Sequence, residues 1–345
     1  MPELTIDSRT VEVAEGATIL DAARKLGIDI PTLCFLEGRS PQTSCMACLV
    51  KVDGRERLLP ACATKVRGGM RVESETDEVR QARRMALELL LSDHLGDCIA
   101  PCHAVCPAHI NIPRMIRQIA CGRAENAAVT AAPCRDCAAP CEKACRRAVK
   151  DNAVSIRLLV RYAAELSQAV AAPLPAAERE YSVHIGRVEK DEIDLFMTDA
   201  SPAGRIEPSQ GPGAGFTEDE ARLEALRCLH CDCRRPGDCR LRKYAAACGA
   251  KPNEYRGGRR AFEQHVPPQT VIYEPGKCIA CGLCVRITKD AAEPLGLAFI
   301  GRGFNVRVAV PFDGSLEEGL QRTAAECVGA CPTGALAFKD DPKEA

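Results

Sequence analysis

The sequence predicts an α+β protein made of several small domains, and three observations support this. The first 75 residues alternate short strand patterns with one capped helix, and later stretches show helical periodicity. The 22 cysteines of the 345-residue chain fall into separate groups. With no Trp, 5 Tyr and 8 Phe, the composition excludes one large aromatic core.

Charge and hydropathy exclude several classes of protein. The 46 basic and 47 acidic residues give a net charge of -1, which argues against nucleic-acid binding through a chain-wide positive field. The opening MPELTIDSRTVEV lacks the apolar core of a secretory signal, and no apolar run of about 18 residues exists to span a membrane. We therefore expect a cytoplasmic protein whose cysteines are metal ligands rather than disulfides.

Residues 1–78 are expected to form the first domain. Thr18 with Asp21 three residues later predicts a helix start, and Gly27 predicts its end. Period-two patterns predict strands at 4–6, 11–13 and 48–52.

The first cysteine group lies in and after the loop between this helix and the third strand. It comprises Cys34, Cys45, Cys48 and Cys62, with the spacing C-x10-C-x2-C-x13-C. Four thiolates suffice for a [2Fe–2S] cluster, and also for zinc. The segments EGATILDAARKLGIDIPTLC and ACATKVRGGMRV resemble the [2Fe–2S] ferredoxin-like domain that fronts the complex I iron–sulfur subunit, iron-only hydrogenases and NAD-linked formate dehydrogenases. That resemblance, over about residues 3–75, implies a β-grasp fold and a [2Fe–2S] cluster on these four cysteines.

Residues 79–170 are expected to form a helical domain. An amphipathic helix over 79–90 leads to His94. In the complex I family the matching helix ends in His-x3-Cys, and that histidine ligates a [4Fe–4S] cluster; His94 and Cys98 fit, but the family's following C-x2-C-x5-C is missing. The cysteines of this second group are Cys98, Cys102, Cys106, Cys134, Cys137, Cys141 and Cys145.

The continuation of this region resembles another family. Cys106-Pro107 leads into INIPRMIRQIACGRAENA, and a second cysteine run follows, as in the two-cluster N-terminal domain of the glutamate synthase small subunit and of dihydropyrimidine dehydrogenase. The resemblance implies two [4Fe–4S] clusters. The first set is His94, Cys98, Cys102 and Cys145, and the second is Cys106, Cys134, Cys137 and Cys141. The alternative for His94 is a surface residue that closes the helix.

Residues 171–216 are rich in Ala, Pro and Gly and are expected to form a linker. The GPGAG at 211–215 follows no apolar strand and opens no βαβ unit, so it is not predicted to bind phosphate. No flavin or nicotinamide site is expected in this chain.

Residues 217–265 are expected to form a Cys-rich helical segment. Thr217 with Glu220 predicts a capped helix, and RLRKYAAACGA predicts a second one. Its cysteines support a [4Fe–4S] cluster, with zinc as the competitor and Cys248 as a possible replacement ligand. They are Cys228, Cys231, Cys233 and Cys239.

Residues 266–345 are expected to form a ferredoxin-like domain. Three cysteines at C-x2-C-x2-C spacing with a distant Cys-Pro are typical of one [4Fe–4S] cluster. The arrangement resembles the single-cluster domain of the complex I iron–sulfur subunit and formate dehydrogenases. The ligands are Cys278, Cys281, Cys284 and Cys331. Cys121 and Cys327 have no assigned role.

Together these patterns predict an iron–sulfur electron-transfer subunit without a catalytic site of its own. It would carry one [2Fe–2S] and three to four [4Fe–4S] clusters. The resemblances imply a hetero-oligomeric oxidoreductase of an anaerobe, of hydrogenase, formate dehydrogenase or electron-bifurcating type. The partners would be a flavoprotein that oxidises NAD(P)H and a second redox subunit. Two alternatives stay open: a zinc-rich structural or regulatory protein, and a reductase with an unrecognised flavin site.

Overall fold

A computed structural model describes residues 1–127, 129–166, 188–197, 200–211, 213–235, 237–255, 257 and 271–339. The chain divides into two compact units, one of Met1–His94 with Gly237–Ala345 and one of Leu95–Pro236. Much of the predicted linker, and the ends of the two predicted segments after it, lie outside the described residues. Within the described residues, none of the helices combines the length and apolar character that a membrane span requires.

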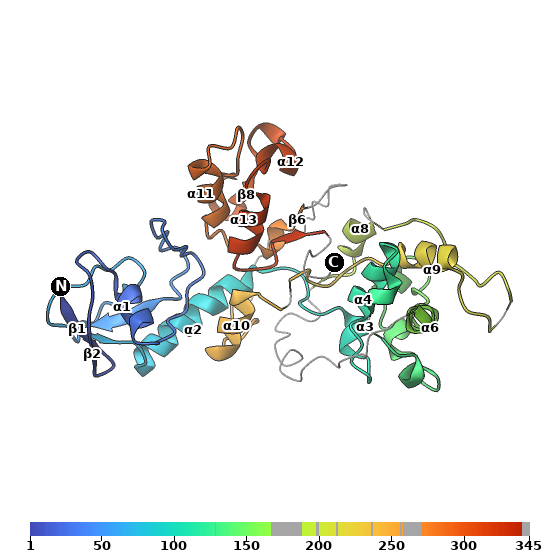
Figure 1. Cartoon of the computed structure of the whole chain (residues 1–345), viewed down its shortest axis with the longest axis horizontal. Coiled ribbons are helices and arrows are strands. Elements are labelled where there is room, and N and C mark those ends of the chain that lie inside the picture. Colours follow the sequence, from blue (N-terminus) through green and yellow to red (C-terminus); the bar gives the residue numbers. More distant parts are fainter. Residues whose placement is uncertain are drawn as a thin grey trace. The chain divides into compact units, whose positions relative to one another are not determined.

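The first unit begins with a mixed five-stranded sheet in the order β2-β1-β5-β3-β4 (Figure 1). β1 pairs antiparallel with β2 and parallel with β5, which places Leu4 opposite Met70. Helix α1 (Ile19–Lys25) lies between β2 and β3 in the chain. This order of elements has the topology expected of a β-grasp domain. The strands are β1 (Glu3–Ile6), β2 (Arg9–Glu12), β3 (Leu49–Val52), β4 (Leu59–Pro60) and β5 (Met70–Glu73).

Local sequence signals explain these elements. Thr18 and Asp21 form the predicted capping box, in which each side chain accepts a hydrogen bond from the other residue's backbone N–H. α1 buries Ile19, Leu20 and Ala23 against the alternating apolar positions of the sheet. The strand and helix predictions for this region are therefore confirmed to within two residues.

Two further helices belong to the same unit. α2 (Asp77–Ser92) is capped by Thr76, and α10 (Arg240–Ala247) packs beside it. The Arg84 side chain donates to the Cys248 carbonyl at 3.0 Å, which ties the end of α10 to α2. α2 thus lies with the sheet domain, whereas the sequence groups it with the helical segment.

The C-terminal part of this unit has two short antiparallel ribbons. β6 (Val271–Tyr273) pairs with β9 (Leu336–Phe338), and β7 (Ala298–Ile300) pairs with β8 (Arg307–Ala309). Helices α11 (Leu283–Asp290) and α13 (Ala324–Ala330) contact each other, and α12 (Leu316–Gly319) precedes α13. Their shared core includes Ile287, Val308 and Cys327.

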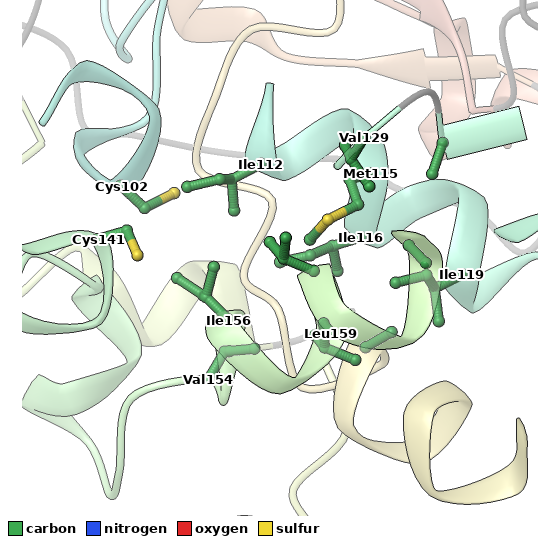
Figure 2. Packing of buried hydrophobic residues seen from close by; sticks show 14 of the residues in the cluster. Cys102, Ile112, Met115, Ile116, Ile119, Val129, Cys141, Val154, Ile156 and Leu159 are labelled. Carbon is green, nitrogen blue, oxygen red and sulfur yellow. The ribbon is translucent and has the colours of Figure 1, made fainter. Parts of the chain in front are cut away.

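The second unit is helical. α4 (Ile112–Ala120) packs against both α6 (Ile156–Leu166) and α9 (Glu218–Ala225). Figure 2 shows Ile112, Met115 and Ile116 of α4 facing Ile156 and Leu159, with Cys102 and Cys141 to one side of this cluster. Among its described residues this unit also has the short α-helices α3 (Pro101–Ala104), α5 (Pro140–Lys143) and α8 (Ile193–Phe196).

The connection into α9 takes part in this packing. Ile206 and Phe216, both in the predicted linker, join the same apolar cluster as α4 and α6. Thr217 and Glu220 form the predicted capping box at the start of α9. The described residues from 200 onward therefore bring the next cysteines, starting at Cys228, onto the helical unit.

Candidate metal centres

The four cysteines of the first group lie together as two close pairs. The sulfurs of Cys34 and Cys45 are 3.3 Å apart, and those of Cys48 and Cys62 are 3.4 Å apart. All four are buried. Two thiolates about 2.3 Å from one tetrahedral metal lie about 3.8 Å apart, so each pair is spaced to bind one iron. The donor set therefore fits a [2Fe–2S] cluster with two ligands per iron.

Within each pair the sulfurs polarise each other. The hydrogen bond with Cys45 lowers the pKa of Cys34 to about 5, and the hydrogen bond with Cys62 lowers the pKa of Cys48 to about 7. The same bonds, with burial, raise the pKa of Cys45 and of Cys62. The lowered pKa of one thiol in each pair therefore favours the thiolate form that metal binding needs.

The cysteines predicted for the C-terminal cluster also gather. Burial raises the pKa of Cys284, and charges on Cys278, Cys281 and Cys331 raise it further, so the four sulfurs lie within electrostatic reach of one another. The backbone N–H of Ala280 donates to the Cys278 sulfur at 3.4 Å. Hydrogen bonds of this kind to ligand sulfurs help set a cluster's potential.

The unassigned Cys327 has a different environment. It is fully buried on α13, and its thiol donates to the Cys284 carbonyl at 3.9 Å. That contact gives Cys327 a packing role beside the C-terminal set.

The first and last cysteine groups are neighbours within the first unit. A charge on Cys34 contributes to the raised pKa of Cys281, after burial and the nearer cysteine Cys331. Leu36, just after Cys34, packs on the C-terminal core. Two candidate centres from opposite ends of the chain therefore lie close to each other.

In the second unit the members of one predicted set lie within electrostatic reach of one another. Burial raises the pKa of Cys134, as do charges on Cys106 and Cys137. Burial raises the pKa of Cys141 to about 12, and Cys106 and Cys134 add to that rise. Cys134 also borders an open cavity of about 830 Å³ whose walls carry four arginines, Arg135, Arg157, Arg161 and Arg205.

A second cavity in this unit gathers cysteines that the sequence places in different sets. Cys102 and Cys145 line it together with Cys228 and Cys231. The sequence instead groups Cys102 and Cys145 with His94 and Cys98. It groups Cys228 and Cys231 with Cys233 and Cys239.

The other members of those expected sets are distributed between the two units. Cys98 and Cys233 are buried in the helical unit, while His94 and Cys239 belong to the first unit. The Cys239 thiol donates to the Pro332 carbonyl at 3.8 Å, next to Cys331. In the described part of the chain, no three His, Cys, Asp or Glu side chains converge closely enough for one metal ion. The thiolates of a cluster bind separate irons and do not converge on one point.

Three residues near these centres carry no sequence signal. Tyr273 on β6 lies by the C-terminal set, where burial and then Cys278 raise its pKa. Arg146 lines the cavity of Cys102, and Arg39 reaches from the first cysteine loop to α11 and α13. No motif or spacing in the sequence singles out these three residues. Only the tertiary contacts show that they lie beside the candidate centres.

Comparison with known proteins agrees with the first candidate centre. Residues 2–77 match the family described as "2Fe-2S iron-sulfur cluster binding domain". The NADP-reducing hydrogenase subunit HndD of Solidesulfovibrio fructosivorans is 50% identical over 104 residues, which are 29% of this chain and 18% of that protein. An NADH-quinone oxidoreductase subunit of Rhizobium meliloti is 44% identical over 98 residues, which are 28% of this chain and 12% of that protein.

A solved structure resembles the chain more broadly. A crystal structure of an NAD+-reducing [NiFe]-hydrogenase in the H2-reduced state aligns with 98% of this chain and 87% of its own, with a TM-score of 0.52 and 18% identity. This likeness concerns the fold. The chain spans less than a fifth of the length of the curated relatives named above. Together the matches show a [2Fe–2S] domain at residues 2–77 that is similar to domains of hydrogenase and NADH-quinone oxidoreductase subunits.

Proposed function

We propose that this chain is an electron relay inside a multi-subunit NAD(P)-linked oxidoreductase. The observation that carries the proposal is the proximity of the Cys34 and Cys281 groups within one unit, which would place two centres in series. Iron–sulfur clusters supply one-electron chemistry, and the protein tunes them through burial and hydrogen bonds to sulfur.

The proposed centres in the first unit are one [2Fe–2S] and one [4Fe–4S]. The former would use Cys34, Cys45, Cys48 and Cys62, and the latter Cys278, Cys281, Cys284 and Cys331. Their support is the sulfur spacing and the shared electrostatics described above. In the second unit, Cys106, Cys134, Cys137 and Cys141 would hold another [4Fe–4S] cluster, on the same kind of support.

The proposed partners are a flavoprotein subunit that oxidises NAD(P)H and a second redox subunit. The support is the nature of the relatives, which are subunits of an NADP-reducing hydrogenase and of an NADH-quinone oxidoreductase. The open cavity beside Cys134 is lined by four arginines and by Glu142 and Glu165, which pair with Arg205 and Arg161. The positive charge that remains would suit an acidic surface of such a partner.

Metal analysis of the anaerobically purified full chain tests the proposal. The expected result is about 14 to 18 irons with matching sulfide, and low-temperature EPR signals of both cluster types after reduction. Zinc in place of iron would overturn the relay and favour a structural zinc protein. Iron in the range of about 2 would leave only the [2Fe–2S] domain and would also overturn it.

A further inference from the structure

Two pairs of cysteines from distant parts of the chain line one cavity of the second unit. Cys102 and Cys145 come from the first helical stretch, and Cys228 and Cys231 follow α9. Burial raises the pKa of Cys102, and charges on Cys231, Cys228 and Cys145 raise it further. The four sulfurs therefore share one electrostatic environment.

We propose that Cys102, Cys145, Cys228 and Cys231 together hold one [4Fe–4S] cluster. The inference rests on the relay proposed above and specifies one of its sites in the second unit. It differs from the expected sets because it joins one pair from each of them. Four thiols match the four irons of a cubane, and the apolar walls, which include Pro101, Ile116 and Val154, would keep water away from it.

A buried ionic network holds the two pairs in this relationship. Arg147, two residues after Cys145, donates to the carbonyl of Arg227 at 3.1 Å, and Arg227 is next to Cys228. Arg227 in turn binds Glu224 at 2.8 Å and Asp151 at 3.1 Å. The side chains of Arg227 and Glu224 are wholly buried, so the bond between them is shielded from water.

The loop that carries Cys228 and Cys231 resembles the C-terminal ferredoxin loop. His230 and Ala280, each just before the second cysteine of its pair, both have left-handed backbones, with φ of 45° and 51°. Each donates its backbone N–H to the first sulfur, at 3.5 Å for Cys228 and 3.4 Å for Cys278. The loop is further fixed because Arg117 of α4 binds Asp232 through two contacts of 3.0 Å. The Cys228–Cys231 turn thus has the same local geometry as the turn of the proposed C-terminal cluster site.

The guanidinium group of Arg146 lies in the wall of this cavity. Arg146 lines the cavity, its side chain is 10% exposed, and it is paired with Asp97. Its Nη1 has no hydrogen-bond partner among the described residues. A buried guanidinium with a spare N–H suits a negatively charged occupant, as a thiolate-bound cluster would be.

Single and double substitutions in the full chain test the grouping. Cys145→Ala and Cys228→Ala should each remove about four irons and abolish the same EPR signal. The double variant should lose no more iron than either single variant, because both residues would serve one cluster. If the single variants abolish different signals, and the double variant loses about eight irons, the grouping is overturned and the two expected sets are favoured.

Controls keep the test decisive. The [2Fe–2S] signal of the first unit serves as an internal standard, and Cys121→Ala, at an exposed cysteine, should leave every signal intact. If an alanine variant does not fold, Cys145→Ser and Cys228→Ser should both shift the g-values of one and the same signal; shifts in two different signals would overturn the proposal. A wild-type chain that carries zinc or only about two irons would contradict the relay itself and not the grouping.

Discussion

Arg39 and Asp290 form an ion pair of 2.5 Å although 251 positions separate them in the chain. The same guanidinium binds Glu326 at 2.6 Å. Arg39 lies on the loop between Cys34 and Cys45, while Asp290 ends α11 and Glu326 is on α13. One side chain therefore fastens the [2Fe–2S] loop to the helices beside the C-terminal cysteines.

Substituting Arg39 tests whether this contact sets the distance between the two centres. Arg39→Ala should weaken the contact by about 1 kcal/mol, because the partner carboxylates are half exposed. The expected readout is reduced magnetic coupling between the two reduced clusters, measured by EPR line broadening. The exposed Arg67→Ala should leave the broadening unchanged. Equal broadening in Arg39→Ala and the wild type would show that other contacts fix the distance.

The sulfur distances predict which cysteines share an iron in the [2Fe–2S] centre. Cys34→Ser and Cys45→Ser should perturb one iron site, and Cys48→Ser and Cys62→Ser the other, because each pair is 3.3–3.4 Å apart. Mössbauer spectra of the four variants should therefore fall into two classes. A classification that pairs Cys34 with Cys62 would contradict the assignment.

The buried pair of Arg227 and Glu224 predicts a large loss of stability in the helical unit. Arg227→Met would leave Glu224 buried without its countercharge, at a cost of about 3–5 kcal/mol. Hydrogen exchange of α9 should therefore become much faster. Adding Glu224→Gln should recover part of the protection, because it removes the uncompensated charge. A double variant as labile as Arg227→Met would mean that the network's other bonds dominate.

Asp151 predicts a pH dependence of the same network. Its hydrogen bond with Arg147, followed by those from the Asn152 N–H and Arg227, lowers its pKa below the ordinary 3.8. A carboxylate whose pKa is lower in the folded than in the unfolded state stabilises the folded state. This contribution is complete at pH values above the unfolded-state pKa and is lost as the pH falls through the folded-state pKa. The cluster absorbance of Asp151→Asn should therefore be lost faster than that of the wild type at pH 6. The difference between the two rates of loss should narrow as the pH falls below about 4. Bleaching of the cluster absorbance measures this, and a difference that does not narrow in acid would contradict it.

Arg146 predicts a shift in reduction potential. Burial raises the pKa of the Cys231 thiol to about 12, and the neighbouring Arg146 charge opposes that rise. The same charge would stabilise the more negative, reduced state of a cluster bound there. Arg146→Gln should lower the midpoint potential of that signal by on the order of 60 mV, equivalent to about 1.4 kcal/mol for one electron. Arg146→Lys should restore most of the potential, whereas an unchanged titration in Arg146→Gln would remove Arg146 from the tuning of this site.

Local sequence signals were sufficient for the elements of the first domain, for the start of α9 and for recognising a [2Fe–2S] domain. The capping boxes of Thr18 and Thr217 depend on residues three positions apart, so their chemistry is readable directly. Three of the first four cysteines lie on the loop before β3 and the fourth, Cys62, lies just after β4, so their spacing nearly fixes their geometry.

Local sequence signals could not predict that Cys145 and Cys228 line the same cavity. It depends on Arg147 reaching the Arg227 carbonyl across 80 positions, and on the segment around Ile206 folding back onto α4 and α6. Neither residue type nor periodicity distinguishes Arg147 and Arg227 from solvent-exposed arginines. Grouping cysteines by nearness along the chain therefore gives different sets from grouping them by nearness in space.

The parallel pairing of β1 with β5 has an evolutionary consequence. Because Leu4 and Met70 are neighbours, the first and last strands of the [2Fe–2S] domain pair with each other, and the chain enters and leaves at opposite ends of this strand pair. A module closed in this way can be joined to different downstream sequences with little change to its interior. We expect such a module to occur in front of different downstream sequences, in line with the match of residues 2–77 alone to a recognised family.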